Sequence, residues 1–92
     1  MEAVIFTRPK FDRAFRSLTA QQQAAVQAAI ARVEPAFGRP HLHSGLGLRP
    51  FGKNFEFRAG LDLRILFLPE GGDLHLCFVG NHNQVRAYLK NQ

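Results

Sequence analysis

The chain has 92 residues, one cysteine and a formal net charge of +5, from 12 Lys and Arg against 7 Asp and Glu. This length corresponds to a single domain, residues 1–92, and a hydrophobic fraction of 46% argues against disorder. The lone Cys77 excludes an internal disulfide and a cysteine-based zinc site. The arginine-rich positive charge favours an anionic partner, either nucleic acid or an acidic protein segment.

The sequence shows no sign of secretion or membrane insertion. The first ten residues, MEAVIFTRPK, lack a basic segment followed by a long apolar run. No apolar run approaches the roughly 18 residues that span a bilayer. A cytoplasmic location without membrane association is therefore expected.

The N-terminal half predicts a strand followed by a helical hairpin. The apolar run 3–6 is of strand type, and Thr7 is a candidate N-cap for a helix with Pro9 in its first turn. Thr19 and Gln22 have the spacing of a capping box and begin a second helix, which Pro35 and Gly38 should end. The apolar stripes of the two helices are Phe11, Phe15 and Leu18, then Val26, Ile30, Val33 and Phe37.

The C-terminal half predicts a meander of three strands and a closing helix. Glycines and prolines mark 38–52 as a loop. Strands are expected at 54–58, 62–68 and 74–79, with turns at 59–61 and 70–73. A last helix begins at Asn81 or His82, with Val85 and Leu89 facing inward. The order β-α-α-β-β-β-α predicts an α+β fold, in which an antiparallel sheet of about four strands carries the hairpin on one face.

Two residues of this half suggest chemistry on a phosphate. Arg64 lies within the middle strand and His82 follows the last one, so a hairpin at 70–73 would bring both to one end of the sheet. Histidine can give or take a proton near neutral pH, since its ordinary pKa is about 6.5. Arginine stays protonated and holds phosphate oxygens with a planar fork. His82 is thus a candidate general acid or base, and Arg64 a candidate phosphate clamp.

Each candidate also has a structural interpretation. Arg64 could simply pair with Glu56 or Asp62, and His82 could act only as a helix N-cap. His75, between apolar strand residues, is interpreted as structural. His41 and His43 could touch RNA, and together with His82 they are a weak indication of zinc.

The chain resembles the RelE/ParE toxin superfamily of bacterial toxin–antitoxin systems. The resemblance covers nearly the whole chain and is strongest in GLDLRILFL and LHLCFVGNHNQVRAYLK, with a looser fit over FTRPKFDRAFRSL. It implies a toxin that cleaves mRNA in the ribosome without a metal or other cofactor and is silenced by a cognate antitoxin. ParE-like members share the fold but poison DNA gyrase, and a degenerate member would only bind antitoxin or nucleic acid. These two remain alternatives.

The resemblance also implies roles for individual residues. Arg64 matches the arginine of RelE-like and YoeB-like sites, His82 the histidine of YoeB-like and YafQ-like sites, and Tyr88 a tyrosine of the RelE-like tail. These three are the predicted catalytic residues, although Tyr88 could also be a packed aromatic or stack on a base. Predicted phosphate contacts are Lys53, Arg58 and Arg49, and predicted accessory residues are Asp62 and His43.

The chain departs from the family at three places. Asn81 and His82 stand where RelE-like toxins have a basic pair. The place of the acidic base of YoeB-like toxins falls near Pro50, and Arg58 replaces a second histidine of YafQ-like toxins.

Overall fold

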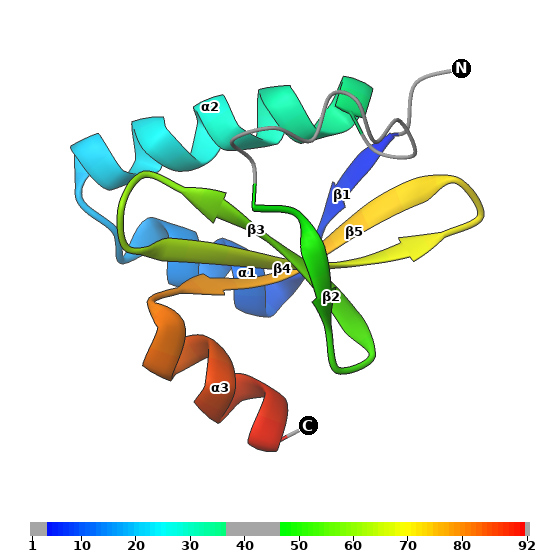
Figure 1. Ribbon diagram of the computed structural model, residues 1–92. Helices are drawn as coiled ribbons and strands as arrows, with labels where there is room; N and C mark the ends of the chain where they lie inside the picture. The colour runs from blue at the N-terminus through cyan, green and yellow to red at the C-terminus, as the bar shows by residue number, and fades with distance from the viewer. Residues whose placement is uncertain (1–3, 37–46, 92) are drawn as a thin grey trace.

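The computed structural model describes residues 4–36 and 47–91, which form one sheet with helices on both of its faces (Figure 1). Its elements are, in chain order, β1 (Ile5–Thr7), α1 (Pro9–Arg16), α2 (Ala20–Ala36), β2 (Arg49–Phe51), β3 (Asn54–Ala59), β4 (Leu63–Glu70), β5 (Asp73–Gly80) and α3 (His82–Lys90). No helix in these ranges has the length and apolar character that a bilayer crossing requires.

The strand order is β1-β5-β4-β3-β2. The predicted meander is present, since β2, β3, β4 and β5 pair antiparallel in sequence order. The described sheet has five strands rather than about four, because Arg49–Phe51 forms β2, where no strand was predicted. The strand predicted at 3–6 corresponds to β1, which pairs with β5 in parallel, with Ile5 opposite Leu74. The α+β prediction is confirmed, and the sheet is mixed.

The larger core lies between the α1–α2 hairpin and one face of the sheet. Phe11 of α1 and Val26 and Val33 of α2 are buried there, as the predicted stripes require. They pack on alternate residues of the strands, because side chains two apart share a face. The buried strand residues of this core are Phe57, Ala59, Leu63, Ile65, Phe67, Leu74, Leu76 and Val79.

A smaller core lies on the opposite face, under α3. Val85 is fully buried against Leu66 and Cys77, and Leu89 packs beside them. A β-bulge contributes to this cluster: Leu66 pairs with Phe78 and Phe67 with Leu76, which leaves Cys77 without a partner in the ladder. Both Cys77 and Phe78 therefore contact the α3 side of the sheet.

The helix ends confirm some of the predicted signals and correct others. Thr19 and Gln22 form the expected capping box, with the backbone N–H of Gln22 donating to Thr19 Oγ1 at 3.1 Å and that of Thr19 donating to Gln22 Oε1 at 2.9 Å. The N-cap of α1 is Arg8, not Thr7, because Thr7 still belongs to β1. Pro35 lies inside α2, which extends to Ala36.

The prediction of a loop over 38–52 is wrong at its end, where Arg49–Phe51 forms β2. No strand was predicted at Pro50 because proline has no N–H group to donate to a strand ladder. It is accommodated here because β2 is the edge strand, paired only with β3 in the described sheet. Phe37 and Gly38 lie outside the described residues.

Candidate functional site

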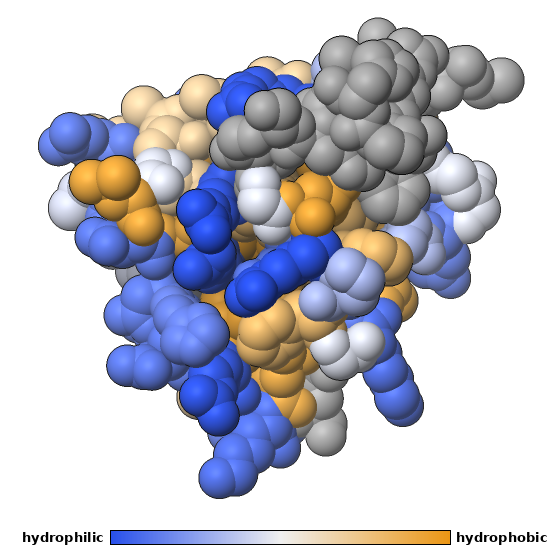
Figure 2. All heavy atoms as spheres, viewed as in Figure 1, coloured by the Kyte–Doolittle hydropathy of each residue, from blue (hydrophilic) through white to orange (hydrophobic). Residues whose placement is uncertain are grey.

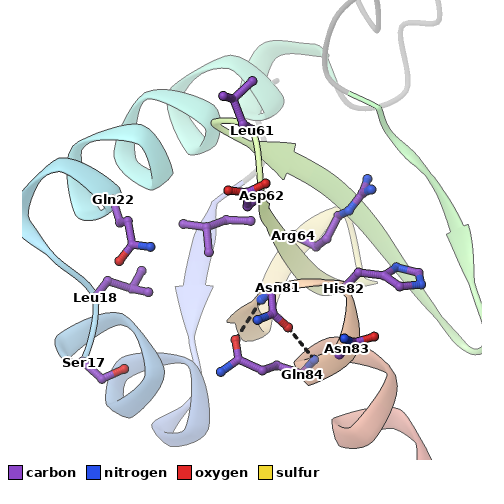
Figure 3. A pocket seen from close by; sticks show the side chains of 11 residues that line it. Ser17, Leu18, Gln22, Leu61, Asp62, Arg64, Asn81, His82, Asn83 and Gln84 are labelled. Carbon is purple, nitrogen blue, oxygen red and sulfur yellow. Dashed lines mark hydrogen bonds between the residues drawn. The ribbon is translucent and has the colours of Figure 1, made fainter.

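A cleft of about 670 Å³ opens at one end of the sheet, where three connections meet. These are the turn between α1 and α2, the turn between β3 and β4, and the junction of β5 with α3 (Figure 3). The cleft is lined by Ser17, Leu18, Gln22, Leu61, Asp62, Leu63, Arg64, Asn81, His82, Asn83 and Gln84. Arg64, His82 and Asp62, three residues singled out from the sequence, thus share one cavity.

Arg64 lies on β4, opposite Gly80 of β5 and Arg58 of β3. Its side chain is 21% exposed, and its Nη1 lies 3.9 Å from Glu56 Oε1. Arg64 therefore faces the carboxylate of Glu56, as its structural interpretation predicts, and also lines the cleft, while its role as a phosphate clamp stays a prediction. In Figure 3 its side chain and that of His82 extend toward the same side of the ribbon.

His82 is the first residue of α3 and is exposed at the cleft. The N-cap is Asn81, so the interpretation of His82 as the cap is wrong. Asn81 Oδ1 accepts from the backbone N–H of Gln84 at 2.8 Å, and Gln84 Oε1 accepts from the backbone N–H of Asn81 at 2.8 Å. This capping box, drawn in Figure 3, fixes the turn that presents the imidazole.

Asp62 lies in the turn before β4 and not in the strand, which begins at Leu63. The carboxylate is exposed at the mouth of the cleft beside Leu61. Leu61 is 99% exposed, and so places an apolar side chain at the rim of a polar cleft.

Tyr88 lies outside this cleft, in a neighbouring groove of about 570 Å³ between α1 and α3. Its ring stacks on Phe78 with the centroids 4.8 Å apart and the planes at 3°. Lys10 Nζ lies 5.4 Å from the same ring centroid. Ser17, Leu18 and Gln84 line both cavities, so the groove adjoins the cleft.

The predicted phosphate contacts divide into two groups. Arg49 and Arg58 lie on the sheet face that also carries Arg64, since Arg49 pairs with Glu56 and Arg58 with Arg64. Lys53 lies in the turn between β2 and β3, at the opposite end of β3 from the cleft. Figure 2 shows strongly hydrophilic residues gathered around an apolar patch on the face that it displays.

Glu56 was predicted from the sequence only as a possible partner of Arg64. Its carboxylate is fully buried on β3, between Arg49 and Arg64. The alternation Phe55, Glu56, Phe57 assigned it to the polar face of a strand, which is correct, but the Glu56 side chain is buried there although Arg58 on the same face is exposed. The sequence did contain a signal for this buried ion pair, because Glu56 shares a predicted strand face with Arg58 and lies near Arg64 in the predicted meander.

The remaining histidines contribute little to the cleft. His75 stacks on Phe6 with ring centroids 5.0 Å apart and lies 3.7 Å from a carboxylate oxygen of Glu70, in agreement with a structural role. His41 and His43 lie outside the described residues. Within 4–36 and 47–91, no three His, Cys, Asp or Glu side chains gather in a way that could hold a metal ion.

Comparison with known proteins finds likeness in structure only. No protein-family model and no curated protein matches the chain. A RelE–RelB complex from Pyrococcus horikoshii matches with a TM-score of 0.67 at 12% identity, over 91% of this chain and 99% of the matched chain. A RelB–RelE antitoxin–toxin complex from Methanococcus jannaschii matches with 0.66 at 13% identity, over 90% and 96%.

The isolated RelE toxin of E. coli also matches, with a TM-score of 0.61 at 9% identity, over 98% of this chain and 99% of that one. These likenesses cover nearly the whole of each chain, so the resemblance seen in the sequence extends to strand order and helix placement. The chain has the fold of the RelE toxins.

Proposed function

We propose that the chain is the toxin of a type II toxin–antitoxin pair and acts in the cytoplasm as a metal-free endoribonuclease on ribosome-bound mRNA. The observation that carries the proposal is the shared cleft of Arg64 and His82 in a RelE fold. A cognate antitoxin is part of the proposal because the matched structures include an antitoxin–toxin complex, that of Methanococcus jannaschii.

The chemistry follows from the side chains in the cleft. In metal-free cleavage the ribose 2′-oxygen attacks the adjacent phosphorus and the bond to the 5′-oxygen breaks, leaving a 2′,3′-cyclic phosphate. Arg64 would hold the phosphate oxygens as charge develops on them. His82 would take the proton from the 2′-hydroxyl or give one to the leaving 5′-oxygen. Asp62 lines the same cleft and could orient or assist the imidazole.

The test is induced expression of the protein and of two variants. Arg64→Ala should lose about 2–4 kcal/mol of transition-state stabilisation, and His82→Ala should slow cleavage roughly a hundredfold or more. Both variants should fold, because Arg64 is only partly buried and His82 is exposed. Growth arrest, with primer extension on a reporter mRNA, gives the readout.

A second function has an observation in its favour. Tyr88, one of the three predicted catalytic residues, lies in a different cavity from Arg64 and His82. A ParE-like inhibitor of DNA gyrase needs no nuclease site, so this separation would not matter to it. If both alanine variants arrest growth like the parent while plasmid supercoiling is blocked, gyrase is the target and the nuclease proposal is wrong.

A further inference from the structure

Glu56 is a buried charged residue that contacts Arg64 of the cleft and also Arg49. Its side chain is 0% exposed, and Oε1 accepts a hydrogen bond from Arg49 Nε at 2.7 Å while lying 3.9 Å from Arg64 Nη1. Oε2 is buried and has no hydrogen-bond partner among the described residues. A buried carboxylate oxygen without a hydrogen bond lowers the stability of the fold, so we expect Glu56 to have a functional role that offsets this cost.

The strand register explains why a negative charge is useful at this point. Arg58 and Arg64 are directly opposite on β3 and β4, and like charges in that arrangement repel. Arg49 is opposite Glu56 on the next strand. One carboxylate thus shares a sheet face with three arginines, two of which approach it to 2.7 Å and 3.9 Å, and that face keeps a surplus of positive charge suited to phosphate.

The third arginine, Arg58, is exposed but lies close to Gly47. A Cβ atom on Gly47 would lie 2.9 Å from Arg58 Cγ and 3.0 Å from Arg58 Cδ and Nε. The side chain of Arg58 therefore runs close along the backbone that leads into β2, which leaves it little freedom on that side.

The geometry points to Glu56 as a positioning residue: its carboxylate holds the guanidinium groups of Arg49 and Arg64 in place as a paired site for the phosphates of single-stranded RNA. The inference rests on the proposed function and gives Arg49, already a predicted phosphate contact, a defined place beside Arg64. Glu56 does not itself act as the base, because a fully buried carboxylate cannot reach the ribose hydroxyl.

Glu56→Gln tests this with little change in shape. The amide oxygen can still accept from Arg49, but the charge that attracts Arg64 is lost. We expect kcat on an RNA oligonucleotide to fall between about tenfold and a hundredfold, because Arg64 would no longer be held in the position that the reaction needs. KM should not rise, because the substitution removes a negative charge near the RNA. Loss of fold would also lower the apparent kcat at an unchanged KM, so kcat must be expressed per folded protein, with the folded fraction measured by circular dichroism.

Glu70→Gln is the matched control. It makes the same change of charge at an exposed residue by the turn between β4 and β5, where Glu70 lies 4.0 Å from Arg8 and 3.7 Å from His75. Its kcat should equal that of the parent. An equal fall in both variants, or parental kcat in Glu56→Gln, overturns the inference while the proposed function stands.

A second measurement does not depend on cleavage or on the variant folding. In the parent, ¹⁵N relaxation of the arginine Nε–H groups should show Arg49 and Arg64 nearly as ordered as the backbone, and exposed Arg13 of α1 mobile. If Arg64 is as mobile as Arg13, Glu56 does not position it and the inference fails. If the parent orders both groups but cleaves no RNA, the proposed function fails and the paired anion site remains.

Discussion

At the scale of single residues, His82 and Tyr88 are close in sequence but only His82 lines the cleft. His82 and Tyr88 are six residues apart on α3, and at about 100° per residue their side chains leave the helix axis roughly 120° apart. His82 consequently faces the cleft, while Tyr88 turns toward α1 and packs on Phe78. The ring of Tyr88 supports α3 and lines the groove beside the cleft.

Two substitutions of Tyr88 separate its ring from its hydroxyl. Tyr88→Phe should keep the stack on Phe78 and retain the parental cleavage rate, because the hydroxyl lies outside the cleft of Arg64 and His82. Tyr88→Ala should lose the stack, worth about 0.5–1.5 kcal/mol beyond burial of the ring. Denaturant unfolding and RNA cleavage assays measure the two effects. A large loss of activity in Tyr88→Phe would show that the hydroxyl takes part in the reaction.

Cys77 offers a pH-dependent test of the smaller core. Burial raises the pKa of its thiol above the ordinary 9.0, against opposing contributions from the charge of Arg8 and a hydrogen bond with Asn54. As pH rises past 9.0, the unfolded chain loses this proton more readily than the folded one, so this group's contribution to stability declines. Alkylation requires the thiolate and should be slow in the native protein and fast in denaturant. Rapid native labelling at pH 8 would contradict the burial of Cys77 under α3.

At the scale of secondary-structure elements, the features predicted correctly depend on interactions between residues close in sequence, whereas a missed strand pairing depends on residues far apart. The capping box at Thr19, the turn with Gly71 and Gly72, and the inward positions Val26, Ile30 and Val33 of α2 depend on neighbours in sequence, and all are confirmed. The parallel pairing of β1 with β5 joins segments at opposite ends of the chain, so no local sequence pattern predicts it. The predicted meander at 54–79 placed Arg64 and His82 at the same end of the sheet, because a short hairpin turn makes the two strands that it joins pair with each other.

The junction of β5 with α3 is the element most directly tied to the proposed chemistry. Asn81→Ala removes the side chain that caps α3, which should cost about 1 kcal/mol of stability. The first turn, which carries His82, should then fray, so we expect cleavage to fall by more than the loss of folded protein explains. Circular dichroism melts and single-turnover cleavage are the measurements.

Ile30→Val is the control for that experiment. It should also cost about 0.5–1.5 kcal/mol, but in the core under α2, where Ile30 packs against the larger cluster. If both variants lose activity in proportion to stability alone, the capping box does not position His82.

At the scale of the whole molecule, the two faces of the sheet have different roles. The α1–α2 side contains the larger core, whereas the α3 side carries the buried carboxylate and its arginines. The domain measures 32 × 28 × 20 Å, and its full sequence carries a formal charge of +5. A partner that silences the proposed nuclease would have to cover the arginine-bearing face or block the cleft. The acidic segment of an antitoxin is the complementary candidate.

Binding of that antitoxin should therefore depend on salt and on the face that carries the charge. We expect its Kd to rise steadily between 50 and 500 mM NaCl, since the Debye length shortens from above about 10 Å to a few ångströms over this range. Arg58→Glu and Arg32→Glu change the net charge equally, each from +5 to +3. Arg58 is exposed on the sheet face with Arg64, whereas Arg32 belongs to α2 on the other side of the sheet. Titration calorimetry at each salt concentration should show Arg58→Glu weakening the complex well beyond Arg32→Glu. Equal weakening would mean that only net charge matters, and a Kd that does not change with salt would show that the antitoxin binds through an apolar surface instead.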